Sequence, residues 1–149
     1  KSSIVIFLSE VLSSIIKEEE PNPELYEFLE TSFIWFDQAP LDTNFHLVFL
    51  TELTKYLGFY PNIENIHLEY FNLQDGNFQD SSEKNCISGE NIVVLRKVLG
   101  TKFDVDKKLK LTNVQKRSFL NMILNYFKLH LDGFREPKSL EVLNHVFTS

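Results

Sequence analysis

Cysteine is nearly absent from this 149-residue sequence. The one thiol, Cys86, can form no internal disulfide, and nothing else indicates a secreted protein. A structural zinc site normally needs four cysteine or histidine ligands, and no two of the four histidines have the spacing of a metal pair on one helix face. They are His46, His67, His130 and His145. We therefore expect no metal site and no cofactor.

The usual catalytic and nucleotide-binding motifs are also missing. The 5 glycines are scattered, so no GxGxxG or GxxxxGK[ST] phosphate loop occurs, and neither does HExxH or GxSxG. The residues on both sides of Cys86 match no pattern of a catalytic cysteine. We therefore expect a protein that is not an enzyme, in which Cys86 is a structural or loop residue.

Long hydrophobic runs are absent as well. The apolar start, residues 4–8, is too short to cross a membrane and is followed by Ser9 and Glu10. It also lacks the small-residue cleavage site of a signal peptide. These features favour a cytoplasmic location. Since the chain starts with Lys1 rather than Met, we expect it to be a piece of a longer protein.

Phenylalanine, by contrast, is frequent, with 14 copies among 43% apolar residues. This composition fits one domain with either a core of large rings or an exposed aromatic groove.

Charge is unevenly distributed along the chain. Residues 1–90 hold 4 lysines against 16 carboxylates, and residues 91–149 hold 11 cations against 5 carboxylates. The split indicates either a basic face on an acidic body or attraction between the two halves.

Six segments have the apolar periodicity of helices. Residues 3–17 form the first segment, and Asn22 caps a second that ends at Ala39-Pro40. Asp42 or Thr43 caps the third, which Gly58 ends. The remaining segments are one capped by Ser88 that runs to residue 99, one capped by Thr112 and stopped at 132–133, and one over about 139–147.

Between the third and fourth segments the pattern changes. Residues 70–73 and Phe78 flank an Asp75-Gly76 turn signal, which predicts a small β-hairpin, and residues 79–85 read as a polar loop. The predicted fold class is therefore mainly α, a bundle-like domain of about six helices with a small inserted hairpin. His130 lies on an apolar helical stripe, which favours a packed histidine over a ligand.

Basic residues gather in the second half of the chain. Such a cluster predicts contact with phosphate or an acidic peptide, and the alternative is a solvated helix start. No aromatic residues are interleaved with it, so base stacking is not indicated. Its members are Arg96, Lys97, Lys107, Lys108, Lys110, Lys116 and Arg117.

Several segments, taken in order, resemble the RecO family of DNA repair proteins, in the form found in Bacteroidetes-type bacteria. They are residues 17–25 (KEEEPNPEL), 44–47 (NFHL), 56–61 (YLGFYP), 70–73 (YFNL), 129–131 (LHL) and 138–143 (KSLEVL). Each segment alone is weak evidence, but their order and spacing over nearly the whole chain are fairly specific.

The resemblance implies an OB-fold followed by a helical domain. No segment of the sequence reads as that barrel, so residues 1–149 are expected to be the helical domain alone. Similar proteins bind single- and double-stranded DNA, promote strand annealing, and help to load recombinase in the nucleoid. They also bind the partner RecR and the acidic tail of single-stranded DNA-binding protein. Many carry a four-cysteine zinc site around the hairpin, and the presence of Cys86 alone predicts a degenerate zinc-ribbon position without zinc.

The resemblance also implies a pocket for the acidic tail. The candidate residues for it are Leu53, Lys55, Leu57 and Phe59. The apolar members serve equally well as core residues. The rival prediction is a generic helical protein–protein adaptor with no role in DNA repair.

Overall fold

The structure is a computed structural model that describes residues 2–16, 21–39, 43–99 and 109–146. Within these ranges it contains six helices and one three-stranded sheet, so the mainly α prediction is confirmed. The helices are α1 (Ser2–Ile15), α2 (Pro23–Gln38), α3 (Phe45–Leu57), α4 (Glu90–Leu99), α5 (Asn113–His130) and α6 (Leu140–Val146). The strands are β1 (Tyr70–Asn72), β2 (Asn77–Gln79) and β3 (Cys86–Ile87).

Local capping signals set most of the helix ends. The side chain of Asn22 accepts a hydrogen bond from the Leu25 amide, which starts α2. Thr112 and Gln115 form a reciprocal capping box at the start of α5. Gly58 follows α3 in the left-handed conformation, with a φ of 96°. These three caps agree with the sequence prediction.

Two predicted helix starts were wrong. The residue at the N-cap of α3 is Asn44 rather than Thr43, and the Thr43 hydroxyl accepts a hydrogen bond from the Lys116 ammonium at 2.6 Å. The other candidate, Asp42, lies outside the described residues. Helix α4 begins directly after Gly89, so Ser88 is one residue too early to cap it. Helix α5 ends at His130 with Leu131 as its C-cap, directly before the predicted stop at 132–133.

The inserted sheet has the strand order β2-β1-β3, and both pairs are antiparallel. Phe71 pairs with Phe78 on one side and with Ile87 on the other. The predicted hairpin is therefore present, but β3 was missed. A strand of two residues is too short to show the alternation that marks strands in a sequence, and its pairing depends on a contact across the loop.

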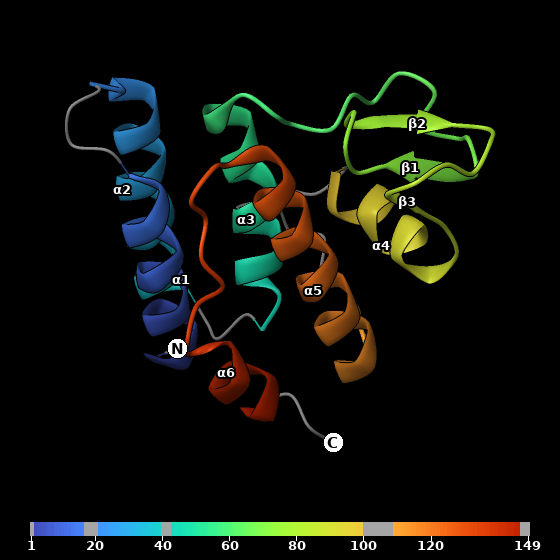
Figure 1. Ribbon diagram of the computed structural model, residues 1–149. Helices are drawn as coiled ribbons and strands as arrows, with labels where there is room; N and C mark the ends of the chain where they lie inside the picture. Colours follow the sequence, from blue (N-terminus) through green and yellow to red (C-terminus); the bar gives the residue numbers. More distant parts are fainter. Residues whose placement is uncertain (1, 17–20, 40–42, 100–108, 147–149) are drawn as a thin grey trace.

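Helix α3 is the centre of the molecule. Residues 45–51 are all buried, and Figure 1 shows α1 and α2 on one side of α3 and α5 on the other. The sheet and α4 lie beyond α5, and α6 packs against α1. Phe45 stacks between Phe36 and Phe49, with ring centroids 4.1 and 5.7 Å apart. The many phenylalanines thus serve mainly as a core of large rings.

One buried group on α3 is titratable. The His46 side chain is fully buried, and its ring meets the Phe7 ring of α1 edge-on. Burial, and to a lesser degree the Lys116 charge, lowers the pKa of His46 to about 3. The imidazole is therefore neutral at neutral pH.

Among the described helices, none combines the length and apolar character needed to cross a bilayer.

Candidate functional site

The four peptide-pocket candidates occupy the last turn of α3 and the residue after its glycine cap. Leu53 is fully buried in the core, so it supports the surface from beneath and offers no exposed wall. Lys55 is exposed, and Leu57 and Phe59 are half-buried. The structure therefore brings three of the four candidates to an accessible position at one end of the bundle.

Phe59 belongs to an aromatic cluster that the sequence alone did not reveal. Its ring stacks on the His130 ring with centroids 4.9 Å apart and nearly parallel planes, and it meets the Tyr126 ring edge-on at 5.4 Å. The Tyr126 hydroxyl donates to the Phe59 carbonyl at 2.5 Å. Burial raises the pKa of Tyr126, so this hydroxyl keeps its proton. His130 is thus a packed histidine, as its apolar stripe indicated.

These contacts join the C-terminal ends of α3 and α5, which lie side by side at the top of Figure 1. We call this region the α3–α5 end. It consists of Lys55, Leu57, Phe59, Tyr60, Tyr126 and His130. The Nε2–H of His130 donates to the Leu73 carbonyl at 2.8 Å, so the region is also tied to the inserted sheet.

Charges around the α3–α5 end differ from one side to the other. The Lys55 ammonium lies 5.3 Å from the centre of the Tyr60 ring, a cation–π arrangement. Partial burial, followed by the charge of Glu52, raises the pKa of Tyr60. Burial raises the pKa of Tyr56 too, with further contributions from Glu52, Glu24 and Glu27. Glu24 and Glu27 therefore make the α2 side acidic, whereas beside Tyr60 the positive charge of Lys55 stands next to the negative charge of Glu52.

The predicted basic cluster is dispersed in the structure. The Arg96 guanidinium donates to the carbonyls of Ile66 and Leu68, so it is used to hold that segment. Lys116 is only 8% exposed, and its ammonium donates to the Thr43 hydroxyl. Both side chains therefore make contacts within the protein and do not form part of a binding surface.

The other members of the cluster lie apart. Glu90 at the start of α4 accepts a hydrogen bond from Gln115 in the first turn of α5, whereas Arg96 and Lys97 are in the last turn of α4. The two parts of the cluster thus occupy opposite ends of α4. Lys97 and Lys110 are exposed and Arg117 is half-buried, while Lys107 and Lys108 lie outside the described residues.

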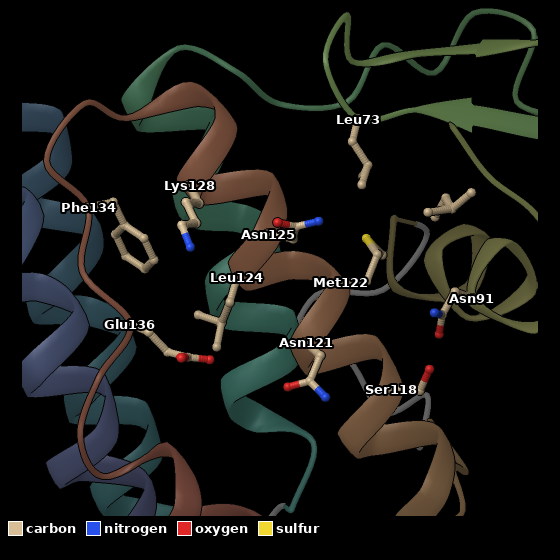
Figure 2. Close-up of a pocket in the computed structure, with 11 residues that line it drawn as sticks. Leu73, Asn91, Ser118, Asn121, Met122, Leu124, Asn125, Lys128, Phe134 and Glu136 are labelled. Carbon is tan, nitrogen blue, oxygen red and sulfur yellow. The ribbon is translucent and has the colours of Figure 1, made fainter. Parts of the chain in front are cut away.

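An open depression of about 420 Å³ lies over the outward face of α5, and we call it the α5 trough. Figure 2 shows α5 running through it, with the 134–136 segment on one side and the sheet and α4 on the other. Its lining residues are Leu73, Ile87, Asn91, Ser118, Asn121, Met122, Leu124, Asn125, Lys128, Phe134 and Glu136.

A network of amide side chains organises the inserted sheet. Asn72 is 3% exposed, and its amide nitrogen donates to Asp75 and to Gln79, each at 3.2 Å. Its amide oxygen accepts from the backbone amides of Gln74 and Asp75. Gln79 in turn donates to the Cys86 sulfur at 3.4 Å. Across the described ranges, no group of three Asp, Glu, His or Cys side chains is placed to hold a metal ion.

Comparison with known proteins gives a consistent result. The family described as "Recombination protein O C terminal" matches residues 1–141. Proteins called "DNA repair protein RecO" from Christiangramia forsetii and Flavobacterium johnsoniae are 47% and 42% identical over 148 residues, and one from Bacteroides fragilis is 32% identical over 152. Each comparison covers 99% of this chain but only 62% or 63% of the relative, so the chain spans less than two thirds of their length. No solved structure matches the chain significantly.

Proposed function

Since the chain belongs to the RecO family, we propose that it is the C-terminal helical part of a DNA repair protein that works by binding and not by catalysis. The observation that carries this proposal is the family match over residues 1–141, together with relatives of up to 47% identity whose printed name is a DNA repair protein. A mainly helical fold in the described residues agrees with such a role.

In this proposal the whole protein is a recombination mediator. It supports recombinase loading and strand annealing, and it binds RecR and single- and double-stranded DNA. DNA binding is assigned mainly to the OB-fold expected outside residues 1–149. Two properties of this part favour that assignment. Residues 1–90 are strongly acidic, and Arg96 and Lys116 are engaged internally, so these two cations are not available to release counterions from DNA.

We assign capture of the acidic, Phe-ended tail of single-stranded DNA-binding protein to the α3–α5 end. Such a ligand needs an apolar wall for its terminal ring and a cation beside it for its carboxylates. Leu57 and Phe59 provide half-buried apolar surface, and the exposed Lys55 provides the charge. The ligand approaches from the Lys55 side, because Glu24 and Glu27 make the α2 side repulsive.

Titration of the 149-residue chain with a fluorescent acidic peptide ending in Phe tests this assignment. We expect micromolar binding, because a disordered tail loses entropy on ordering, and weaker binding at high salt. Lys55→Glu should reduce the affinity about tenfold, because one favourable charge contact becomes repulsive. Lys84→Glu is the matched control, since Lys84 is an exposed lysine in the loop before β3 and should have no effect.

A peptide without the final Phe separates ring recognition from charge attraction. Equal binding of the two peptides would reduce the interaction to charge and contradict the pocket. If neither peptide binds, the chain is better explained as a generic helical adaptor for other proteins.

A further inference from the structure

An open depression of about 440 Å³ is formed by α2 and the last turn of α3, and we call it the α2–α3 cleft. The half-buried rings of Phe28 and Tyr56 stack with their centroids 4.6 Å apart and form an aromatic wall of the cleft. Ser32 is fully buried and forms the floor. The complete lining consists of Glu24, Glu27, Phe28, Thr31, Ser32 and Tyr56.

The Ser32 hydroxyl has no hydrogen-bond partner among the described residues. A buried helical hydroxyl commonly donates to a carbonyl of the preceding turn, and those of Thr51 and Thr54 on α3 do so. A buried polar group without a partner destabilises the folded chain. The Ser32 oxygen is able to accept a hydrogen bond, so it is a polar anchor for a ligand that donates into the cleft.

The carboxylates beside the cleft are not neutralised by the described part of the chain. Helix α2 contains no lysine or arginine, and its exposed Glu24, Glu27 and Glu30 make no ion pair with a described residue. The negative charge reaches the aromatic wall. Burial raises the pKa of Tyr56, and the charges of Glu52, Glu24 and Glu27 raise it further. The cleft therefore favours a cation.

The groups of the cleft fit a guanidinium better than a metal ion. Across the described ranges, no three Asp, Glu, His or Cys side chains are placed to hold a metal. A guanidinium has five donors and a flat face that stacks on aromatic rings, and it is less strongly hydrated than an ammonium. Glu24 and Glu27 are three residues apart on one helix face, so their carboxylates are neighbours. A guanidinium can donate to them and to Ser32 while it lies against the aromatic wall.

The acidic surface continues along α2 beyond the cleft. Glu30 is exposed and is not part of the lining. The six residue steps from Glu24 to Glu30 span about 9 Å of helix, which equals about three residues of extended chain. A single small cation would leave Glu30 without a partner, whereas a peptide with two basic residues is long enough to neutralise both parts of this surface. Charge complementarity therefore favours a basic segment of a protein.

We propose that the α2–α3 cleft binds an arginine side chain in a basic segment of a partner protein. Its guanidinium donates to the Ser32 hydroxyl and to the carboxylates of Glu24 and Glu27, and a second basic residue of the segment lies near Glu30. This ligand has the opposite charge to the acidic tail of the proposed function and occupies a different surface. The carboxylates are exposed, so the affinity is modest and falls as salt is added.

The test uses the 149-residue chain at low salt and a fluorescent, capped peptide of sequence Gly-Ser-Arg-Gly-Arg-Ser-Gly. We expect saturable binding that Ser32→Ala weakens about tenfold, since a hydrogen bond from a charged donor is lost. Ser32→Ala removes a buried hydroxyl without a partner, and alanine favours the helix, so the variant should melt at the same or a higher temperature. Loss of binding then cannot come from unfolding.

The carboxylates are tested with a matched pair of double variants. Glu24→Gln/Glu27→Gln should weaken binding about tenfold or more, because two charged acceptors become neutral. Glu64→Gln/Glu69→Gln removes the same charge from exposed positions before β1 and should have little effect. Peptides with lysine or citrulline in place of arginine test the ligand. Lysine lacks the flat face and citrulline lacks the charge, so both should bind more weakly, citrulline the weaker of the two.

Several outcomes would overturn the proposal. They include the absence of binding at millimolar peptide and equal binding by the parent chain and Ser32→Ala. An equal loss in the two glutamine double variants would reduce the interaction to net charge, and equal binding of the lysine peptide would mean a site for any cation. Free spermidine that binds as tightly as the peptide, and loses affinity in Ser32→Ala, would assign the cleft to a polyamine. The acidic Phe-ended peptide should bind Glu24→Gln/Glu27→Gln no more weakly than the parent chain, so the two proposals can fail separately.

Discussion

The helical body and the inserted sheet of this protein both contain packed aromatic rings, and the insert adds a network of hydrogen bonds around one buried amide. In the body, stacked rings such as Phe36, Phe45 and Phe49 surround the central helix α3, which is buried along much of its length. In the insert, the strands have three, three and two residues, and the rings of Phe71 and Phe78 are buried with their centroids 4.9 Å apart. The buried Asn72 amide of β1 also donates to Asp75 in the turn and to Gln79 of β2, so polar contacts join the apolar ones in stabilising these short strands.

The two regions meet at a few specific contacts. A Cβ atom on Gly76, in the β1–β2 turn, would lie 3.0 Å from the Tyr126 hydroxyl of α5, and Gly76 has a φ of +71°. The Leu73 carbonyl accepts from His130 at the end of α5. The insert is therefore fastened to the same end of α5 that carries the Phe59 cluster. We therefore expect substitutions in the helical body to lower the stability of the whole domain, and substitutions in the insert to lower the stability of the insert alone.

The largest expected effect comes from Phe45→Ala in the body. Phe45 is fully buried between two stacked rings, so its removal leaves a cavity and should lower the free energy of unfolding by about 3–5 kcal/mol. Urea denaturation followed by circular dichroism measures this loss. Tyr26→Ala, at a 45% exposed position on α2, should cost about 0.5 kcal/mol or less.

Hydrogen exchange on the Phe45 variant tests whether body mutations act globally. We expect faster amide exchange in both the body and residues 70–87. If the insert kept its protection while the body lost it, the two regions would unfold independently and would be two separate folding units.

Asn72→Ala is the corresponding destabilising substitution in the insert. It removes both hydrogen-bonding ends of a buried amide and leaves Asp75 and Gln79 without this partner, which should cost about 1–3 kcal/mol. Amide exchange should accelerate over residues 70–87 and remain unchanged in α1 to α3. Asn77→Ala, an exposed amide on β2, is the matched control and should have little effect.

A chelator supplies the complementary test of the insert. Because the buried side chains of Phe71, Leu73 and Phe78 hold the insert together with the hydrogen bonds of Asn72, EDTA should leave the exchange rates of residues 70–87 and the zinc content of the purified protein unchanged. Stoichiometric zinc that EDTA removes, with loss of protection in the insert, would show that a metal and not these contacts holds the strands together.

The smallest expected effect is a pH dependence that belongs to the body. His46 has a pKa of about 3 in the folded chain and 6.5 as a free side chain. Between these values the unfolded chain binds a proton that the folded chain does not, so stability falls as the pH is lowered through 6.5. The loss from His46 should be about 1 kcal/mol between pH 6.5 and 5.5.

Denaturation of the parent chain and of His46→Leu at both pH values isolates this contribution, since carboxylates titrate equally in both proteins. The leucine variant should lose less stability on acidification. His67→Leu, at an exposed position before β1, should lose as much stability on acidification as the parent chain. If the parent chain and His46→Leu lost the same free energy of unfolding between the two pH values, the buried ring would not control acid sensitivity.

Much of the fold could be predicted because its signals are local. Asn22, Gly58 and Thr112 end or begin helices through contacts within one turn, and the Asp75-Gly76 turn lies between the two strands that it joins. Strand β3 was missed because its pairing with β1 depends on residues more than ten positions apart. The hydrogen bond between Thr43 and Lys116 could not be predicted either, since the two residues are 73 positions apart.

The candidate site likewise combines residues that the sequence singles out with residues that only long-range contacts bring near. Leu57 and Phe59 stood out in the sequence through their place in a segment of family resemblance, whereas Tyr126 and His130 join them only through contacts across 67 or more residues. The α5 trough also depends on the fold, because its lining joins residues of α5 to Leu73 after β1, to β3, to α4 and to the segment after α5.

By itself, the sequence determined the mainly helical character, most helix ends, the hairpin and the resemblance to the RecO family, because these depend on local patterns. Only the tertiary structure decided which charges and rings remain available to a partner. Arg96 and Lys116 look like surface cations in the sequence but bind internal oxygen atoms, and Leu53 lies in the core. Burial depends on which elements pack together, and a residue type alone does not state whether water or another helix will be its neighbour.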